Sequence, residues 1–144
     1  MILYLDTSAL VKRYFQEPFS DEVITRWQTA TGIVISSVAY AETLASFYRK
    51  KREADLKEAV VRKVIEAFRL DWQSFIRIEV NDELDEYLDR ALKRYPLRGF
   101  DAIHLASAIL VREGLREEIL FVCFDQLLAR AARKEGFEIF PFDK

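Results

Sequence analysis

Four acidic side chains are the residues whose types and positions in this sequence suit chemistry: Asp6, Glu42, Asp101 and Asp125. Asp6 and Asp125 each follow a short apolar run, Asp101 begins a very apolar segment, and Glu42 lies inside another. In open α/β sheets, ligands bind beyond the carboxyl ends of the strands, where Asp6 and Asp125 are expected to lie. Crowded carboxylates repel one another unless a cation neutralises them, and Mg²⁺ and Mn²⁺ prefer oxygen ligands. The four residues therefore predict a divalent metal site that could activate water for an in-line displacement at phosphorus.

Each acid also has a simpler structural interpretation. Asp6, Asp101 and Asp125 stand where helices are expected to begin, and aspartate is a preferred N-cap residue. Capping and metal ligation are compatible, so this interpretation does not remove the metal site. Glu42 is either an exposed residue at a shifted helix boundary or a carboxylate on an apolar helix face, where it needs a partner.

Short apolar runs alternate with segments of helical composition along the chain, and these are the elements that must position the acids. Strands are predicted at residues 2–5, 33–35, 75–80, 119–124 and 137–140. Helices are predicted at residues 8–15, 20–30, 37–52, 55–70, 82–95, 99–111 and 126–135. The predicted caps are Ser20, Ser36 or Ser37, Asn81 or Asp82, and Asp125. This alternation predicts one α/β domain over residues 1–144, with a mostly parallel sheet buried on both faces.

Composition narrows the class of protein. The 144 residues are 51% hydrophobic and 32% charged, which excludes a disordered or low-complexity chain. One cysteine and one histidine exclude a Cys/His zinc site in a single chain and an intrachain disulfide. No signal peptide or membrane span is expected, so the sequence favours a soluble, cytoplasmic protein.

The net charge of −2 argues against a module that grips duplex nucleic acid by charge alone. Without the four acids singled out above, 20 acidic residues face 22 basic ones, so the rest of the molecule is slightly positive. An acidic site in a mildly basic body suits a phosphodiester substrate that is bound together with a metal ion.

Four segments carry a resemblance to a known family: LYLDTSALVKRY, SSVAYAETLASFYR, LRGFDAIHLASA and LFVCFDQLLARAARKEGFEIFPF. In their order and spacing, the chain resembles PIN-domain proteins, specifically the VapC-type toxin ribonucleases of prokaryotic toxin–antitoxin pairs. The resemblance implies a three-layer α/β/α sandwich and a Mg²⁺- or Mn²⁺-dependent endoribonuclease that hydrolyses RNA with metal-activated water. It also implies a cognate antitoxin protein that masks the acid-lined groove, and a homodimer.

The residues that match the family's catalytic and metal-binding quartet are Asp6, Glu42, Asp101 and Asp125. Ser8 matches a hydroxyl position that supports the site. The family commonly has Thr or Ser two residues before the last aspartate, where this chain has Cys123. This departure concerns the hydrogen bonds around Asp125 and the affinity of any second metal ion.

For other residues near these motifs, the sequence gives weaker evidence of a role in the site. His104, three residues after Asp101, is interpreted as a packed, hydrogen-bonded core residue, with a catalytic base as the alternative. Cys123 is expected to be buried and inert. The basic run 49–52 is read as a solvated helix end rather than an RNA contact. Lys12 and Arg98 are the candidates for contact with phosphate or with a partner.

A second functional class stays open at this stage: a catalytically weak or inactive PIN-fold module that binds a partner, for which Cys123 is the only support. A phosphoaspartyl enzyme at Asp6 is disfavoured because Ser8 stands where such motifs have a second aspartate. Nucleoside triphosphate hydrolysis is disfavoured because the sequence has no glycine-rich phosphate loop.

Overall fold

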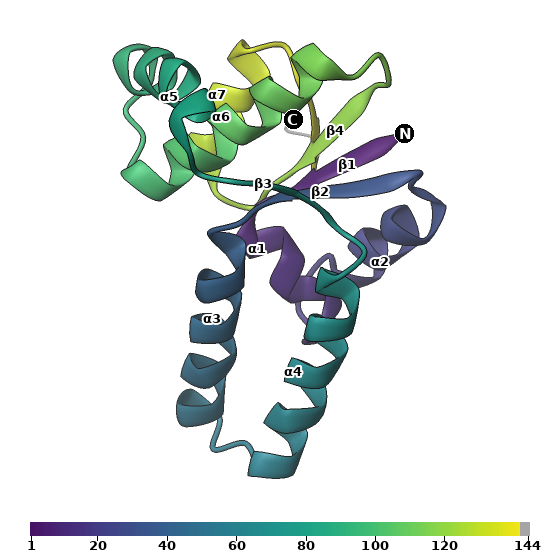
Figure 1. Cartoon of the computed structure of the whole chain (residues 1–144). Helices are drawn as coiled ribbons and strands as arrows, with labels where there is room; N and C mark the ends of the chain where they lie inside the picture. The colour runs from purple at the N-terminus through teal and green to yellow at the C-terminus, as the bar shows by residue number, and fades with distance from the viewer. Residues whose placement is uncertain (142–144) are drawn as a thin grey trace.

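The centre of the molecule is a parallel β-sheet. The computed structural model describes residues 1–141, and within them five parallel strands have the order β3-β2-β1-β4-β5 (Figure 1). The strands are β1 (Ile2–Leu5), β2 (Gly32–Ser36), β3 (Ile76–Ile78), β4 (Ile119–Val122) and β5 (Glu138–Phe140). Since β1 is central, the chain builds one half of the sheet with β2 and β3 and the other half with β4 and β5.

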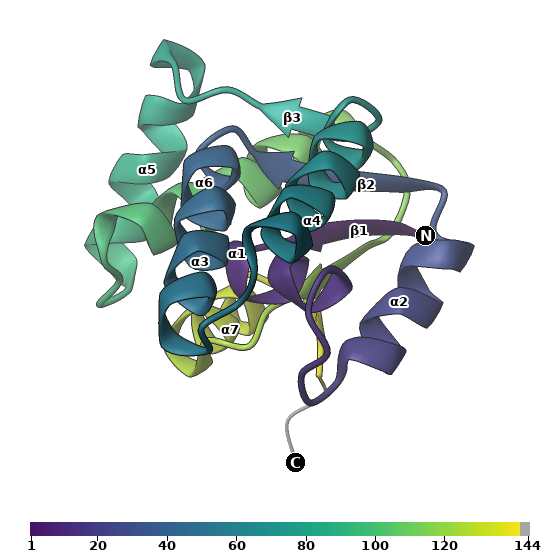
Figure 2. The same ribbon diagram turned by 90° about the horizontal axis from the view of Figure 1, so that it is seen from below.

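Helices cover both faces of the sheet (Figures 1 and 2). One face carries α1 (Thr7–Leu10), the short 3₁₀ helix η1 (Val11–Arg13), α2 (Ser20–Thr29), α3 (Ala39–Glu53) and α4 (Glu58–Trp72). The other carries α5 (Asp82–Arg94), α6 (Gly99–Gly114) and α7 (Gln126–Lys134). The predicted α/β/α sandwich is therefore confirmed, and its sheet is parallel throughout.

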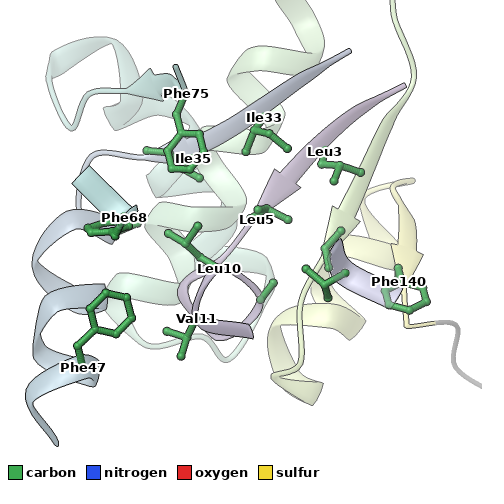
Figure 3. Close-up of a cluster of buried hydrophobic side chains, with 14 of the residues drawn as sticks. Leu3, Leu5, Leu10, Val11, Ile33, Ile35, Phe47, Phe68, Phe75 and Phe140 are labelled. Atoms are coloured by element: carbon green, nitrogen blue, oxygen red, sulfur yellow. The ribbon is translucent and has the colours of Figure 1, made fainter. Parts of the chain in front are cut away.

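Alternation along β1 divides the core into two layers, because successive side chains of a strand point to opposite faces. Leu3 and Leu5 pack with the α1–α4 face, whereas Ile2 and Tyr4 pack with the α5–α7 face. Figure 3 shows the first layer. In it, Phe47 of α3 and Phe68 of α4 are fully buried, with ring centroids 5.7 Å apart.

On the α1–α4 side of the sheet, two predicted caps and one predicted helix start are wrong. The helix predicted from Ser20 does begin there, but Phe19 with φ of 72° is its N-cap, and the Ser20 hydroxyl instead accepts a hydrogen bond from the Glu17 amide. Neither Ser36 nor Ser37 caps α3, whose N-cap is Val38. The helix predicted from residue 55 begins at Glu58. These starts were predicted from residue type, whereas the backbone path decides which residue takes the capping position.

Two predicted elements are shorter in the structure. The helix predicted over residues 8–15 is α1 followed by η1, and the helical path ends at Arg13. The strand predicted over 75–80 is reduced to β3, an edge strand that pairs only with β2, and Ile76 and Val80 are 44% and 45% exposed. No helix within residues 1–141 is long and apolar enough to cross a membrane.

Candidate active site

The order of the strands creates a crevice at the carboxyl ends of β1 and β4. The chain leaves β1 toward β2 in one direction and returns to β4 in the other, and such a switch point is where open α/β sheets bind ligands. Leu5 and Val122 pair at the ends of these two strands. Asp6 directly follows β1, and Asp125 lies three residues after the end of β4. The topology therefore brings these two acids to one edge of the sheet.

Asp6 is buried and tightly held. Its carboxylate caps α1 by accepting a hydrogen bond from the Ala9 amide at 3.0 Å, as the sequence predicted. The Ser8 hydroxyl lies 2.7 and 2.9 Å from the two carboxylate oxygens, and it accepts a hydrogen bond from the Phe124 amide at 3.0 Å. Burial raises the pKa of Asp6, although these hydrogen bonds favour its charged form. Ser8 thus links the end of β1 to the segment that follows β4.

Glu42, on α3, has the partners that its apolar helix face required. The Thr7 hydroxyl donates a hydrogen bond to Oε1 at 2.6 Å, and Nε2 of His104 lies 2.9 Å from the same oxygen. Burial opposes ionisation of the carboxyl, but the hydrogen bonds from His104 and Thr7 outweigh it and lower the pKa of Glu42.

Asp101 carries the electrostatic evidence that the four acids share one site. It lies in the first turn of α6, whose N-cap is Arg98, so the alternative interpretation of Asp101 as a helix cap is wrong. Burial raises the pKa of Asp101, and so do the negative charges of Asp125, Asp6 and Glu42. Charges act on one another in this way only when they are close together. Folding has therefore gathered carboxylates that are up to 119 positions apart in the sequence.

Asp125 and Cys123 complete this edge of the site. Asp125 caps α7 by accepting a hydrogen bond from the Leu128 amide at 2.9 Å, as predicted. Sγ of Cys123 accepts a hydrogen bond from the Asp125 amide at 3.3 Å and lies 3.4 Å from Oδ2 of Asp6. The thiol is buried as predicted, and burial raises its pKa. Cys123 therefore fills the Thr/Ser position as a neutral side chain between two of the acids.

The donor set suits a hard divalent cation, because four mutually repelling carboxylates supply only oxygen atoms. As the side chains stand, residues 1–141 contain no group of three or more His, Cys, Asp or Glu residues spaced to hold an ion. Binding of an ion would thus require oxygen atoms of these acids to come closer together.

A groove of about 530 Å³ leads away from the acids between η1 and α3. Thr7, Ser8 and Glu42 line it near the acids. Its basic side chains are Lys12, Arg49 and Lys50. Glu17 and Glu53 also line the groove. Arg49 is exposed, so the end of α3 is a solvated helix end, as the run 49–52 was predicted to be, with Arg49 and Lys50 beside the groove.

The two basic residues singled out from the sequence occupy different positions. Lys12 lies in this groove, is buried, and pairs with Glu17 at 3.3 Å, while Lys50 pairs with the other oxygen of Glu17. Nζ of Lys12 also lies 4.4 Å from the centre of the Phe124 ring. Arg98 is exposed, precedes Asp101 by three residues, and does not line the groove.

Sequence reasoning missed the hydroxyl groups of Thr7 and Tyr4. Thr7 directly follows Asp6, which could have indicated a hydroxyl at the site. Tyr4 is fully buried in β1, and its hydroxyl oxygen lies 3.0 Å from Nδ1 of His104. His104 is a buried, hydrogen-bonded residue of α6, as predicted, but one of its two partners is a site carboxylate.

Comparison with known proteins agrees with the fold. A family model described as PIN domain matches residues 3–134. Ribonuclease VapC45 of Mycobacterium tuberculosis is 26% identical over 140 residues, which are 97% of this chain and 95% of that relative. Among solved structures, VapC20 of the same species, described as a sarcin–ricin loop cleaving toxin, aligns with a TM-score of 0.62. The two chains are 17% identical, over 94% of this chain and 95% of VapC20. A toxin–antitoxin complex from Klebsiella pneumoniae aligns with a TM-score of 0.58 and 19% identity, over 82% of this chain and 83% of that one.

Proposed function

The chain belongs to the PIN domain family, and from this premise we propose that it is a divalent-metal-dependent endoribonuclease, the toxin of a type II toxin–antitoxin pair. One observation carries the proposal: Asp6 and Asp125 follow β1 and β4 at the switch point of the sheet, and Glu42 is hydrogen-bonded to the residue directly after Asp6. Besides burial, the charges of these acids raise the pKa of Asp101. The nuclease activity is further supported by the relative VapC45, a ribonuclease matched over 97% of this chain. We treat residues 1–144 as a single catalytic domain.

Asp6, Glu42, Asp101 and Asp125 are the residues that would hold Mg²⁺ or Mn²⁺. When bound, the cation supplies activation of water and neutralisation of the charge that develops on the phosphodiester. The protein contributes by holding the metal-binding carboxylates in place. Ser8 restrains both oxygens of Asp6, and Asp6 and Asp125 are anchored by the helices they cap. None of the four acids forms a covalent bond to phosphorus in this proposal.

The groove beside the acids is proposed to bind the RNA backbone. Arg49 lies seven residues after Glu42 on α3, which places it about 10 Å farther along the helix axis. At that separation it would contact a phosphate beyond the one being cleaved. Lys12 and Lys50 share Glu17 and would give the same wall a positive edge. Arg98, beside Asp101 in the sequence, would contact substrate or partner from the other side.

The proposed protein partner is a cognate antitoxin that covers the groove and blocks the acids. The fold is shared with a chain of the toxin–antitoxin complex from Klebsiella pneumoniae. We also propose a homodimer and a cytoplasmic location, where a single buried thiol would stay reduced. Size-exclusion chromatography with light scattering tests the dimer directly, and a monomeric mass would contradict it.

The alternative, a PIN-fold module without catalysis, is not favoured. Its support was Cys123, but the Cys123 thiol keeps contacts with both Asp6 and the Asp125 amide. All four acids are also retained. A module that only binds a partner has no need for carboxylates that repel one another at a buried edge.

The decisive experiment is RNA cleavage by the purified protein with Mg²⁺, with Mn²⁺ and with a chelator. Total bacterial RNA serves as substrate, and sequencing of the new ends identifies the target. Asp6→Asn and Asp101→Asn are expected to lower the cleavage rate at least about 100-fold. Asp89→Asn, an exposed carboxylate of α5, is the control and should cleave normally. Full activity of Asp6→Asn and Asp101→Asn, or activity in chelator, would refute the proposal.

The groove has its own test. Arg49→Ala should raise the KM for RNA with little change in kcat, and should reduce the slope of log affinity against log salt by about one. Arg52→Ala removes a charge from the same helix end but outside the groove lining, so it is the matched control. Equal effects of the two substitutions would show that the charge acts without a specific contact.

A further inference from the structure

A chain of hydrogen-bonding groups runs from the core to Glu42. The Tyr4 hydroxyl lies 3.0 Å from Nδ1 of His104, and Nε2 of His104 lies 2.9 Å from Oε1 of Glu42. The three residues come from β1, α6 and α3, which are far apart in the sequence. We infer that His104 is a positioning residue of the metal site: its imidazole holds the Glu42 carboxylate in the orientation that binds the cation. This inference rests on the proposed function.

The direction of each hydrogen bond follows from the chemistry of the partners. A carboxylate offers no hydrogen, so Nε2 of His104 carries the hydrogen and donates it to Glu42. In the neutral ring Nδ1 then accepts, and the Tyr4 hydroxyl is the donor. Burial raises the pKa of Tyr4 well above its ordinary value, so the hydroxyl keeps this hydrogen. This series of hydrogen bonds therefore ends with the Nε2–H group of His104, which donates to Glu42.

Packing fixes the imidazole in place. The exposed fraction is 2% for His104 and zero for Tyr4. The Tyr4 ring stacks on Phe121 of β4 with centroids 5.1 Å apart, and meets the imidazole edge-on at 6.1 Å. A ring held by its neighbours and hydrogen-bonded at both nitrogens cannot rotate freely, so Nε2 is a fixed reference point for Glu42.

The geometry at Glu42 leaves room for a cation. Thr7 and His104 both bind Oε1, and neither of them binds Oε2. Two donors on one oxygen set the plane and direction of the carboxylate while these donors leave the other oxygen to a ligand. Outer partners of this kind orient metal ligands, and their loss typically costs about 10–100-fold in metal affinity or activity.

The competing explanation is that His104 serves only to fill the core. It makes a different prediction, because a core role affects stability and leaves metal affinity unchanged in any variant that folds. Two substitutions separate the explanations. His104→Gln keeps a side-chain N–H near the position of Nε2, whereas His104→Asn keeps one only near Nδ1 and loses the contact with Glu42. Both remove the ring, and they differ in size by one methylene group.

Mn²⁺ binding by titration calorimetry is the main measurement, with kcat and the half-saturating Mn²⁺ concentration for RNA cleavage alongside. His104→Asn is expected to weaken Mn²⁺ binding about 10–100-fold, and His104→Gln to restore most of this loss. Thermal unfolding without metal should find His104→Asn only slightly less stable than His104→Gln, because its side chain is one methylene group shorter. If both variants bind Mn²⁺ like the wild type, or lose binding equally, the inference is wrong.

A second measurement uses the wild-type fold. His104 is the only histidine in the chain, so its ring ¹⁵N signals are unambiguous in NMR spectra. Addition of Mg²⁺ should move the Nε2 signal in the wild type, and Glu42→Gln should abolish this response. A silent Nε2 signal in protein that binds Mg²⁺ would overturn the inference alone. Wild-type protein that binds no metal and cleaves no RNA would instead overturn the proposed function.

Discussion

Substitution of Asp101 by Asn should stabilise the metal-free protein while it destroys the metal site. The pKa of Asp101 is raised by burial and by the charges of Asp125, Asp6 and Glu42, so its ionised form is disfavoured in the folded state. Asparagine keeps the shape of the side chain and removes the charge. At pH 8, where the carboxyl is ionised, this relieves repulsion that the unfolded chain does not have.

The size of the effect can be worked out. Asp101 is only partly buried, so solvent screens its interactions, and we expect a gain of about 0.5–1 kcal/mol. The unfolding entropy of a 144-residue chain is about 0.3 kcal/mol per kelvin, so the melting temperature should rise by about 2–3 °C. Mg²⁺ at a hundred times its dissociation constant should stabilise the wild type by about 2.7 kcal/mol, or about 9 °C. Because Asp101→Asn should not bind the ion, it should not gain this stabilisation. Asp101→Asn should therefore melt at a higher temperature than the wild type without metal and at a lower temperature with Mg²⁺.

Differential scanning calorimetry at pH 8, with Mg²⁺ and with chelator, measures both halves of this prediction. Asp89→Asn is the control, because it removes a negative charge from an exposed position on α5. It should follow the wild type in both conditions. The reasoning fails if Asp101→Asn is destabilised in chelator, or if Mg²⁺ stabilises it as much as the wild type.

Three further predictions concern stability and reactivity. Glu135→Gln should lower the free energy of unfolding at pH 7 by about 1–3 kcal/mol, since it loses charge-assisted hydrogen bonds from Arg94 and Tyr95. The folded-state pKa of Glu135 is lowered, so its stabilisation exists above the unfolded pKa of about 4.3 and is lost as pH falls. Urea unfolding should therefore show a smaller difference in the free energy of unfolding between Glu135→Gln and the wild type at pH 3.5 than at pH 7. Phe68→Ala should cost about 3–5 kcal/mol in the same assay, because the ring is fully buried. Cys123 should react with a thiol reagent only as fast as the protein opens, because burial raises its pKa, and unfolding by guanidinium should make the reaction immediate.

Local signals were sufficient for part of the site. Asp6 and Asp125 are predictable because each follows an apolar strand and begins a helix, and both do cap helices in the structure. The need of Glu42 for a partner follows from its apolar neighbours, and the structure supplies two donors. These inferences succeed because each depends on a few residues of one segment.

What the sequence could not reveal depends on how distant segments pack. The sequence near Glu42 does not predict His104, 62 residues away, as its partner. The contact forms only when α6 and α3 meet at the end of the sheet. The start of α6 at Gly99 was predicted correctly, but the alternative interpretation of Asp101 as its cap is wrong, since Arg98 is the N-cap. The helix start at Ser20 was predicted correctly, but its cap was misassigned because the backbone conformation of Phe19 decides the capping position.

One helix joins the stability of the fold to the chemistry of the site. His104 and Asp101 are three residues apart on α6, nearly one turn, so they lie on the same side of the helix. Burial of His104 against Tyr4 therefore helps to hold the turn of α6 that carries Asp101. The same ring holds Glu42, which arrives from α3. Two acids from different segments are thus located by a single buried side chain, and substitution of that side chain should disturb Glu42 and Asp101 together rather than one at a time.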